Sequence, residues 1–379
     1  MYLSDERYFM GKKIHVISFS VPYPADYGAV IDVYYKLKAL QQAGLNIILH
    51  CFENGRLPAP ELDALCEKVY YYPTKNGMFS QLSCLPNVVS VRNHPDLLKN
   101  LLDEIAPVLF EGIQSCYLFD HPLLSAYQKI VRVHHIEHLY FANMAGSEKS
   151  AGKKYYYRLE AYRLKQFEKK LKSASQLIGL SSTDTEYFKA SYGNALYVPA
   201  FHPHAKVISK PGKGDYILFH GNLSLTENLD VVKYLLRKIF SEITVPFVIA
   251  GKNPPAWLVS KAKVIPHVSV IGNPTKGEMT NLIREAQICL VPGFHTTGLK
   301  LKLLASLFCG RHCLTNSTML YGSGLSKLCH IADTPEEMIN LIGRYMELGF
   351  TSGEIIKRRH ELENLYSNEK NAKKILAVI

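Results

Sequence analysis

Residues suited to binding an anion gather in the stretch Pro292–Cys313. An apolar run ending at Val291 leads into Pro292 and Gly293, small and polar residues follow, and leucines then recur at helical spacing up to Gly310. This order predicts a strand, a loop and the start of a helix. Backbone N–H groups at a helix start lack partners within the helix and carry partial positive charge, which suits a phosphate group.

Five residues of this stretch are candidates for holding such an anion: Thr296, Thr297, Gly298, Lys300 and Lys302. The threonines and the glycine let a ligand come close. The lysines oppose the helix dipole, an arrangement that makes more sense if an anion is bound there. The alternative is a buried strand–helix unit whose lysines point into water, and spacing alone does not separate the two interpretations.

A second group of reactive side chains, His134, His135 and Glu137, follows the apolar strand pattern Lys129–Val133. These residues come at the carboxyl end of that strand, where ligand crevices form in open α/β sheets. The alternative is a strand-end histidine that caps backbone groups.

The segment Lys153–Lys172 combines eight cations with interleaved aromatic residues and only two acids, Glu160 and Glu168. As a helix it has an aromatic side and a basic side. It could rest on the anionic inner face of a membrane and meet a lipid-linked acceptor. The alternative is a helix packed by its aromatic residues, with its basic face in water.

The bulk composition is that of a globular protein with an anionic partner. The length of 379 residues predicts two or three domains, and 47% hydrophobic with 20% charged residues is ordinary for a globular protein. The net charge of +11 resides mostly in residues 201–379, which hold 22 Lys and Arg against 14 Asp and Glu. No apolar run approaches the ~20 residues of a membrane span, and residues 1–13 do not form a signal peptide. Because no Arg-rich aromatic patch or zinc finger occurs, nucleic acid is the weaker choice of partner.

The eight cysteines form no CxxC pair and no Cys/His zinc spacing. We expect them to be reduced and buried in a cytoplasmic protein.

Strand and helix patterns alternate along the whole chain, which predicts an α/β fold with parallel sheets. Gly28 lies in the loop after the first strand, where the lack of a side chain lets the backbone come close to a sugar or phosphate. The loop contains no GxGxxG motif, so the sequence does not support a nicotinamide dinucleotide as ligand. We predict two Rossmann-like, doubly wound domains facing each other across a cleft. The expected divisions are an N-terminal tail (1–12), a first domain (13–199), a Pro/Gly/Lys-rich linker (200–214), a second domain (215–352) and closing helices (353–379).

Five motifs in this order resemble the GT-B glycosyltransferases, in particular the family-4-type retaining enzymes of bacterial surface-polysaccharide pathways. The motifs are PYPADYG, RVHHIEHLYF with the following long helix, ILFHGNLSLTENLDVV, VIAGK and TTGLKLKLLASLFCG. The resemblance covers nearly the whole chain. It implies hexosyl-type transfer from a nucleotide-diphosphate sugar, bound mainly by the second domain, to a glycan or lipid-linked acceptor on the first.

The resemblance also assigns site residues by their positions in this sequence. The residues implied to bind the donor are Gly28, Gly221, Asn222, Gly251, Lys252, Gly272, Thr296, Thr297, Gly298, Lys300 and Lys302. His134 matches the motif histidine and is implied to hydrogen-bond the donor sugar or diphosphate, and Glu137 to orient the donor or the acceptor. The leaving diphosphate helps to take the acceptor proton, so that neither a carboxylate pair nor a metal or other cofactor is expected.

Two departures from the family pattern affect the donor site. Asn222 stands where the family has an arginine and the position of its lysine falls near Asn228, so Lys300 or Lys302 would have to supply the charge. The family's two glutamates align with Thr297 and Ala305, and Ala305 cannot hydrogen-bond a ribose. Two alternatives stay open. A nucleotide-sugar 2-epimerase has the same fold but would need catalytic carboxylates in the crevice, and a catalytically silent relative that acts as a binding or partner subunit is supported by the two departures.

Overall fold

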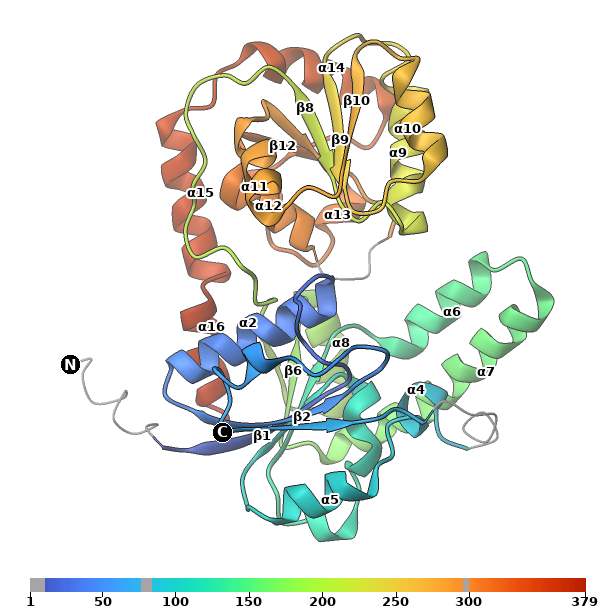
Figure 1. Ribbon diagram of the computed structural model, residues 1–379, viewed down its shortest axis with the longest axis vertical. Helices are drawn as coiled ribbons and strands as arrows, with labels where there is room; N and C mark the ends of the chain where they lie inside the picture. Colours follow the sequence, from blue (N-terminus) through green and yellow to red (C-terminus); the bar gives the residue numbers. More distant parts are fainter. Residues whose placement is uncertain (1–10, 76–83, 296–299) are drawn as a thin grey trace. The chain divides into compact units, whose positions relative to one another are not determined.

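The computed structural model describes residues 11–75, 84–295 and 300–379. The chain divides into two compact units (Figure 1). Unit 1 comprises the chain up to Pro203 together with Tyr366–Ile379, and unit 2 comprises His204–Leu365. Each unit is built around one parallel β-sheet with helices on its faces, so the predicted pair of doubly wound, Rossmann-like domains is confirmed.

The sheet of unit 1 has seven strands in the order β3-β2-β1-β4-β5-β6-β7. Their bounds are β1 (Lys13–Ser18), β2 (Asn46–Phe52), β3 (Lys68–Tyr72), β4 (Val108–Glu111), β5 (Lys129–Val133), β6 (Gln176–Gly179) and β7 (Ala195–Tyr197). Most of them are short apolar runs, as expected for strands covered on both faces. Strands that follow one another in the sequence are neighbours in the sheet, except β3 and β4. Strand β4 pairs with β1 instead, on the side opposite to β2. Such a switch point is where ligands bind in sheets of this type.

Helices cover both faces of this sheet. The α-helices are α2 (Gly28–Gln42), α4 (Asn87–Ser90), α5 (Pro95–Leu102), α6 (Glu137–Ser147), α7 (Ala151–Glu168), α8 (Ser182–Tyr192) and α16 (Asn368–Leu376). The 3₁₀ helices are η1 (Pro60–Leu62), η2 (Ile113–Leu118), η3 (Pro122–Leu124) and η4 (Lys169–Ser173). Helices α6 and α7 pack against each other as a hairpin that projects from the body of the unit (Figure 1).

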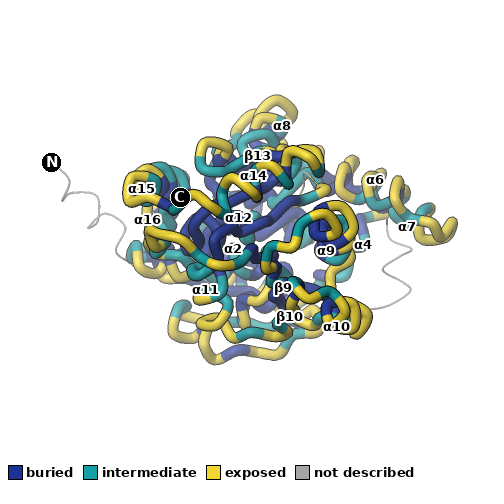
Figure 2. Tube along the Cα trace, turned by 90° about the horizontal axis from the view of Figure 1, so that it is seen from above, coloured by how far each residue is buried: buried dark blue, intermediate teal, exposed yellow. Residues whose placement is uncertain are grey.

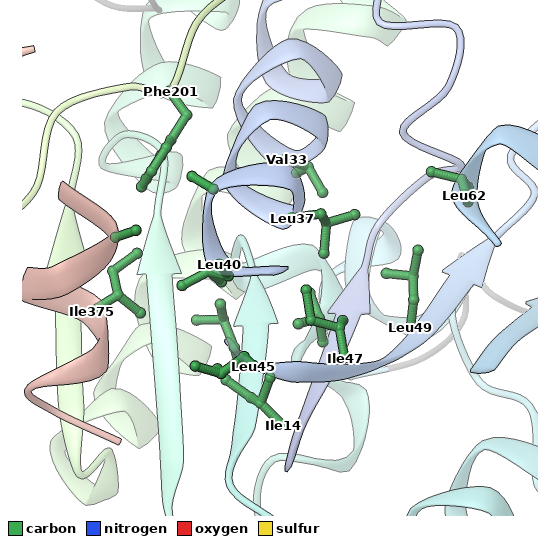
Figure 3. Packing of buried hydrophobic residues seen from close by; sticks show 14 of the residues in the cluster. Ile14, Val33, Leu37, Leu40, Leu45, Ile47, Leu49, Leu62, Phe201 and Ile375 are labelled. Atoms are coloured by element: carbon green, nitrogen blue, oxygen red, sulfur yellow. The ribbon is translucent and has the colours of Figure 1, made fainter. Parts of the chain in front are cut away.

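Helices α2 and α16 share one face of the sheet (Figure 3). Leu37 and Leu40 of α2, three residues apart on one side of the helix, pack with Ile14 and Ile47 of the strands. Ile375 of α16 joins the same cluster, although it lies more than 300 residues away in the sequence. Each of these side chains is fully buried. Complete burial of a Leu or Ile side chain contributes about 1.5–3 kcal/mol, so α16 is part of the core of unit 1.

The sheet of unit 2 has six strands in the order β10-β9-β8-β11-β12-β13. Their bounds are β8 (Ile217–His220), β9 (Phe247–Gly251), β10 (Val268–Gly272), β11 (Ile288–Leu290), β12 (His312–Thr315) and β13 (His330–Ile331). Here β8 pairs with both β9 and β11, which places the switch point between β8 and β11.

The helices of unit 2 alternate with its strands. They are α9 (Thr226–Lys238), α10 (Ala256–Lys263), α11 (Lys276–Glu285), α12 (Leu301–Cys309), α13 (Ser317–Leu320), η5 (Ser326–Leu328), α14 (Pro335–Glu347) and α15 (Ser352–Leu365). Both α11 and α14 begin with a capping box, Thr275 with Glu278 and Thr334 with Glu337, which satisfies backbone N–H groups at the helix start. Figure 2 shows that α10 and α15 expose much of their outer faces.

The cysteines match the sequence-based expectation in part. All eight cysteines are free, but Cys84 is exposed and Cys66 and Cys329 are half-buried, so the expectation of buried cysteines is wrong for these three.

Among the helices of the described residues, none combines the length and the apolar character needed to cross a membrane.

Candidate functional site

Loops after β8, β9 and β10 lie together at the carboxyl edge of the six-stranded sheet. A Cβ atom on Gly251 would lie 1.7 Å from the carbonyl oxygen of Gly221, and one on Gly272 would lie 2.9 Å from Cγ of Pro254. Gly272 is also the strand partner of Gly251. Three of the predicted donor-binding glycines are therefore neighbours. Close backbone packing explains why Gly251 and Gly272 lack side chains, whether or not a ligand binds.

The polar residues predicted beside these glycines have different surroundings. Asn222 turns its side chain back on its own loop, where Oδ1 accepts hydrogen bonds from the backbone N–H of Ser224 at 3.0 Å and from its hydroxyl at 2.7 Å. Lys252 is exposed, and its carbonyl oxygen accepts a hydrogen bond from Leu223 N–H at 2.9 Å. The loop that contains Asn222 is thus held in shape by its own hydrogen bonds and by the loop after β9.

Lys302, in the first turn of α12, points at the loop after β8 rather than into water. Its Nζ donates a hydrogen bond to Oδ1 of Asn228 at 2.5 Å and lies 5.3 Å from the ring centre of Phe219. Nδ2 of Asn228 donates in turn to the carbonyl oxygen of Asn222 at 2.8 Å. Burial lowers the pKa of Lys302 to about 8. The predicted cation and the predicted Asn222 loop are therefore brought together across the switch point of unit 2.

The remaining candidates of this region lie beside α12. Lys300 is the N-cap residue of α12, and its Nζ donates a hydrogen bond to the carbonyl oxygen of His295 at 3.2 Å. Thr296, Thr297 and Gly298 lie outside the described residues.

His220, at the end of β8, was not predicted as part of the site. Its Nε2 lies 3.0 Å from the hydroxyl of Ser306 on α12, and burial next to Lys302 lowers the pKa of His220 to about 3. The neutral ring thus ties β8 to α12 directly beneath Lys302. The sequence signal that could have identified His220 is a histidine at the end of an apolar strand pattern.

In unit 1, His134 follows β5 at the carboxyl edge of the seven-stranded sheet. Its side chain is 7% exposed, and its ring meets the ring of Phe19 edge-on at 5.5 Å between centres. Its Nε2 lies 3.6 Å from Oε2 of Glu111, the last residue of the neighbouring strand β4. Gly28 is the first residue of α2, the helix that follows β1. Both predicted residues therefore lie at the edge where ligands bind.

Glu137, the first residue of α6, is buried and pairs with His135 rather than with His134. Its Oε2 lies 3.1 Å from Nε2 of His135, and its Oε1 accepts a hydrogen bond from Nε2 of Gln114. Burial alone would raise the pKa of Glu137, but the neighbouring His135 outweighs it and lowers that pKa. Burial would lower the pKa of His135, and Glu137 instead raises it. The pair is an ion pair at mildly acidic pH.

A network of buried charges behind His134 was missed by the sequence interpretation. The carboxylate of Asp32 accepts two hydrogen bonds from the guanidinium of Arg132, both at 2.9 Å, and one from Lys36 at 3.1 Å. Lys36 also donates to Glu111 at 2.7 Å. All four side chains are fully buried. Burial would raise the pKa of Asp32, but Arg132 and Lys36 hold it well below its usual range.

Two sequence signals marked this network. Asp32 and Lys36 lie four residues apart on the same side of α2 as its core leucines, and Glu111 and Arg132 interrupt apolar strands. Charged residues at such positions are almost never fully buried unless they are paired.

The network includes three groups able to bind a metal ion, since ligand atoms of Asp32, Glu111 and His134 lie within 4.8 Å of one another. The two carboxylates already share the ammonium group of Lys36. An amino group of the chain therefore supplies the counter-charge that a divalent cation would bring, and the donor set does not fit a metal site.

Helix α7 buries both of its acids and exposes several of its cations and tyrosines. Glu160 is buried and accepts a hydrogen bond from Val88 N–H at 3.0 Å, and Glu168 is buried against His138 at 2.9 Å. The residues that share the outer side, at spacings of three and four, are Tyr155, Arg158, Tyr162, Lys165 and Lys169. All five are exposed, which gives α7 a basic and aromatic outer stripe without an acid.

The comparisons with known proteins concern the fold of the chain. No family model matches the chain. A Klebsiella pneumoniae protein described as an uncharacterized 44.6 kDa protein in the cps region is 25% identical over 389 residues, covering 94% of this chain and 98% of that protein. Sucrose-phosphate synthase from Thermosynechococcus elongatus is similar over 97% of this chain and 98% of its own, with a TM-score of 0.69 and 14% identity. The fold is GT-B.

A second solved structure supports the same GT-B assignment. It is a mutant of TarM from S. aureus in complex with fondaparinux, alpha-GlcNAc-glycerol and UDP. It covers 97% of this chain and 99% of its own, with a TM-score of 0.65 and 10% identity. Both sheets of this chain are included in the match. At this level of identity the likeness establishes the GT-B fold and leaves the reaction to be argued from the site.

Proposed function

We propose that this GT-B protein is a glycosyltransferase that moves a hexosyl-type sugar from a nucleoside-diphosphate donor to a glycan or lipid-linked acceptor. The observation that carries the proposal is the position of Lys302, whose ammonium group lies beside the Asn222 loop at the switch point of unit 2. A fixed cation next to a helix start is suited to a diphosphate. The fold supports the proposal because the solved structures that it resembles include glycosyltransferases.

In the proposed donor site, Lys302 supplies the charge that Asn222 and Asn228 do not. Lys300 and the start of α12 add a second cation and the partial positive charge of a helix N-terminus. Gly221, Gly251 and Gly272 let the donor approach the edge of the sheet, and Lys252 is exposed at the same edge. The nucleotide is proposed to be uridine diphosphate, which the TarM structure contains.

In the proposed acceptor domain, His134 hydrogen-bonds the donor sugar or diphosphate, and Glu137 orients the donor or the acceptor. Transfer with retention of configuration needs no carboxylate pair, because the leaving diphosphate oxygen takes the acceptor proton and the surrounding cations stabilise its charge. No metal ion is required in this scheme, since Lys302, Lys300 and the start of α12 together offset the charge of the diphosphate.

We place the reaction in surface polysaccharide or glycoconjugate assembly. The description of the Klebsiella relative, a protein of the cps region, is consistent with this setting. The outer stripe of α7 is proposed to contact the anionic inner face of a membrane, where Lys and Arg side chains are attracted by acidic lipids and tyrosines lie at the interface. A lipid-linked acceptor would be met at that surface.

One observation favours a second candidate function, a silent relative that binds nucleotide without transferring sugar. Ala305 lies within α12 and has no polar atom in its side chain, although the family pattern expects a glutamate that reads the ribose. The loss of a charged hydrogen bond of this kind costs about 1.5–3 kcal/mol of binding free energy.

The experiment that tests the proposal has two steps. A thermal-shift screen against UDP, GDP, ADP and their sugars identifies the nucleotide. Product analysis with the nucleotide sugar that raises the Tm then measures hydrolysis and transfer. His134→Ala should abolish transfer while the Tm and the circular dichroism spectrum stay those of the native protein. Nucleotide binding without hydrolysis or transfer across the donor panel favours the silent relative, and no binding at all contradicts both functions.

A further inference from the structure

Glu111 occupies an unusual position for a charged residue. It closes β4, at the switch point of unit 1, and is 0% exposed. Its Oε2 accepts a hydrogen bond from Lys36, while Oε1 has no hydrogen-bond partner among the described residues. Nε2 of His134 is likewise buried without a partner among them and lies 3.6 Å from Oε2 of Glu111. The two groups face each other at a distance just beyond a hydrogen bond.

The groups around Glu111 hold it as an anion in one place. Burial would raise its pKa, but Lys36 outweighs burial and lowers it. Lys36 is itself held by Asp32, which is anchored by Arg132 and by a hydrogen bond of 2.7 Å from Phe201 N–H. The guanidinium of Arg132 donates to the carbonyl oxygens of residues 198 and 199 as well. The network therefore ties α2, β4, β5 and the segment after β7 into one rigid support for His134.

We infer that Glu111 is a positioning residue that keeps the proton of His134 on Nε2 and so presents an unprotonated Nδ1 to a sugar hydroxyl. A neutral imidazole carries a proton on one nitrogen only. A lone pair on Nε2 would face the carboxylate of Glu111 and be repelled, whereas an N–H there is attracted. Nδ1 is then an acceptor, which takes a hydrogen bond from a hydroxyl group and cannot donate one to a phosphate oxygen.

This inference rests on the proposed function and sharpens it. It assigns His134 to a hydroxyl of the donor sugar or of the acceptor, and it removes the diphosphate from the choices given above. The diphosphate is left to the cations of unit 2.

The first test needs no substrate, so that it stays informative if sugar transfer is not found. Ring ¹⁵N NMR spectra, with the His134 signals assigned by comparison with His134→Asn, should show the Nε2–H tautomer in the native protein. Glu111→Gln should produce a mixture of tautomers, because an amide can either donate to Nε2 or accept from it. An Nδ1–H tautomer in the native protein overturns the inference.

The second test separates positioning from stability by a double-mutant cycle. Glu111→Gln should lower kcat about tenfold to a hundredfold, the range for lost outer partners of metal-bound histidines, with little change in nucleotide affinity. In a His134→Asn background, which keeps a polar side chain at this position, the same change should have no further effect on turnover. Equal losses in both backgrounds overturn the inference.

Two variants control for the loss of a buried carboxylate. Glu160→Gln removes another buried carboxylate of unit 1, one that has a single unpartnered oxygen and lies on α7, and it should leave kcat and the His134 tautomer unchanged. Lys36→Met combined with Glu111→Gln removes one cation and one anion, which keeps the charges of the buried network balanced. If Glu111→Gln does not fold, this double variant should show the same tautomer mixture, and a native tautomer in it contradicts the inference.

Discussion

The ammonium nitrogen of Lys302 lies 2.5 Å from Oδ1 of Asn228. Asn228 belongs to the helix that follows β8 and Lys302 to the helix that follows β11, so this one contact joins the two sides of the switch point in unit 2. Asn228 is 4% exposed, and Lys302 is largely buried over Phe219. A cation that is already partly stripped of water in the free protein loses little more when an anion arrives, which favours phosphate binding there.

Replacing Lys302 with methionine should weaken the binding of a nucleoside diphosphate about tenfold to a hundredfold. The reason is that one charged hydrogen bond of about 1.5–3 kcal/mol is lost while the length of the side chain is kept. Isothermal titration with the nucleotide identified in the thermal-shift screen measures the change. Lys263→Met, at an exposed lysine of α10, is the matched control and should bind normally. Equal affinity of Lys302→Met and the native protein would remove Lys302 from the donor site.

The same lysine predicts how nucleotide affinity depends on pH. Because burial lowers the pKa of Lys302 to about 8, the free protein loses this charge as pH rises through that value. A phosphate anion favours the protonated amine, so affinity should fall between about pH 7 and about pH 9, by up to about tenfold. Titrations of Lys302→Met should lack this fall. An affinity of the native protein that does not change over this range contradicts the prediction.

The His135–Glu137 pair predicts a pH dependence of stability. The folded-state pKa of His135 is raised above 6.5, so its contribution is fully present below pH 6.5 and is lost as pH rises through the folded-state value. The pKa of Glu137 is lowered below 4.5, so its contribution is lost as pH falls through its folded-state value. Urea unfolding followed by circular dichroism should show the free energy of unfolding declining above pH 6.5 in the native protein. His135→Gln should decline less over the same range, and an identical decline would show that another group is responsible.

Arg132 should be essential for the stability of unit 1. Its replacement by methionine leaves Asp32 buried with Lys36 as its remaining charged partner, and breaking a buried pair in this way costs about 3–5 kcal/mol. Lys13→Met is the comparison, because Lys13 forms ion pairs near the surface with Glu67 and Glu104, where water and salt screen the charges and little stability is lost. Urea unfolding of the two variants measures both losses. A loss below about 1 kcal/mol for Arg132→Met would mean that the network relaxes around the vacancy.

The outer stripe of α7 should bind vesicles that contain acidic lipid. Reversing the charge of Arg158, Lys165 and Lys169 should abolish co-sedimentation with such vesicles, since each cation near an acidic surface contributes about 1 kcal/mol. Reversing Lys261 and Lys263 of α10 together with Lys238 of α9, all exposed in unit 2, alters the net charge equally and should leave binding intact. Co-sedimentation that ignores acidic lipid content and salt would contradict the membrane proposal.

The architecture could be predicted from the sequence because both sheets are parallel and buried on both faces. Such strands appear as short apolar runs separated by helical patterns, and the predicted strand Lys129–Val133 coincides with β5. Helix α16 shows what the sequence pattern could not predict. Its apolar spacing predicted a helix, but an amphipathic pattern does not say which sheet the helix covers. That it packs on α2 follows only from the folded chain.

The candidate sites were predictable in position and not in their contacts. His134 and Gly221 could be placed at strand ends because the carboxyl edge of a parallel sheet is set by the order of the elements. The burial of Lys302 over Phe219 depends on a helix and a strand that lie some 80 residues apart. Asp32 and Glu111 were missed because a charged residue reveals its partner only after the chain has folded.

The connection of α16 to unit 1 also affects how the protein is made. During synthesis the ribosome releases Ile14, Leu37 and Ile47 long before Ile375, so one face of the N-terminal sheet stays without its last covering helix while all of unit 2 emerges. A chain cut after Leu365 would retain every strand of both sheets and yet expose this apolar face to chaperones and proteases. Unit 2, by contrast, is a continuous segment and can form its own core as soon as it has left the ribosome.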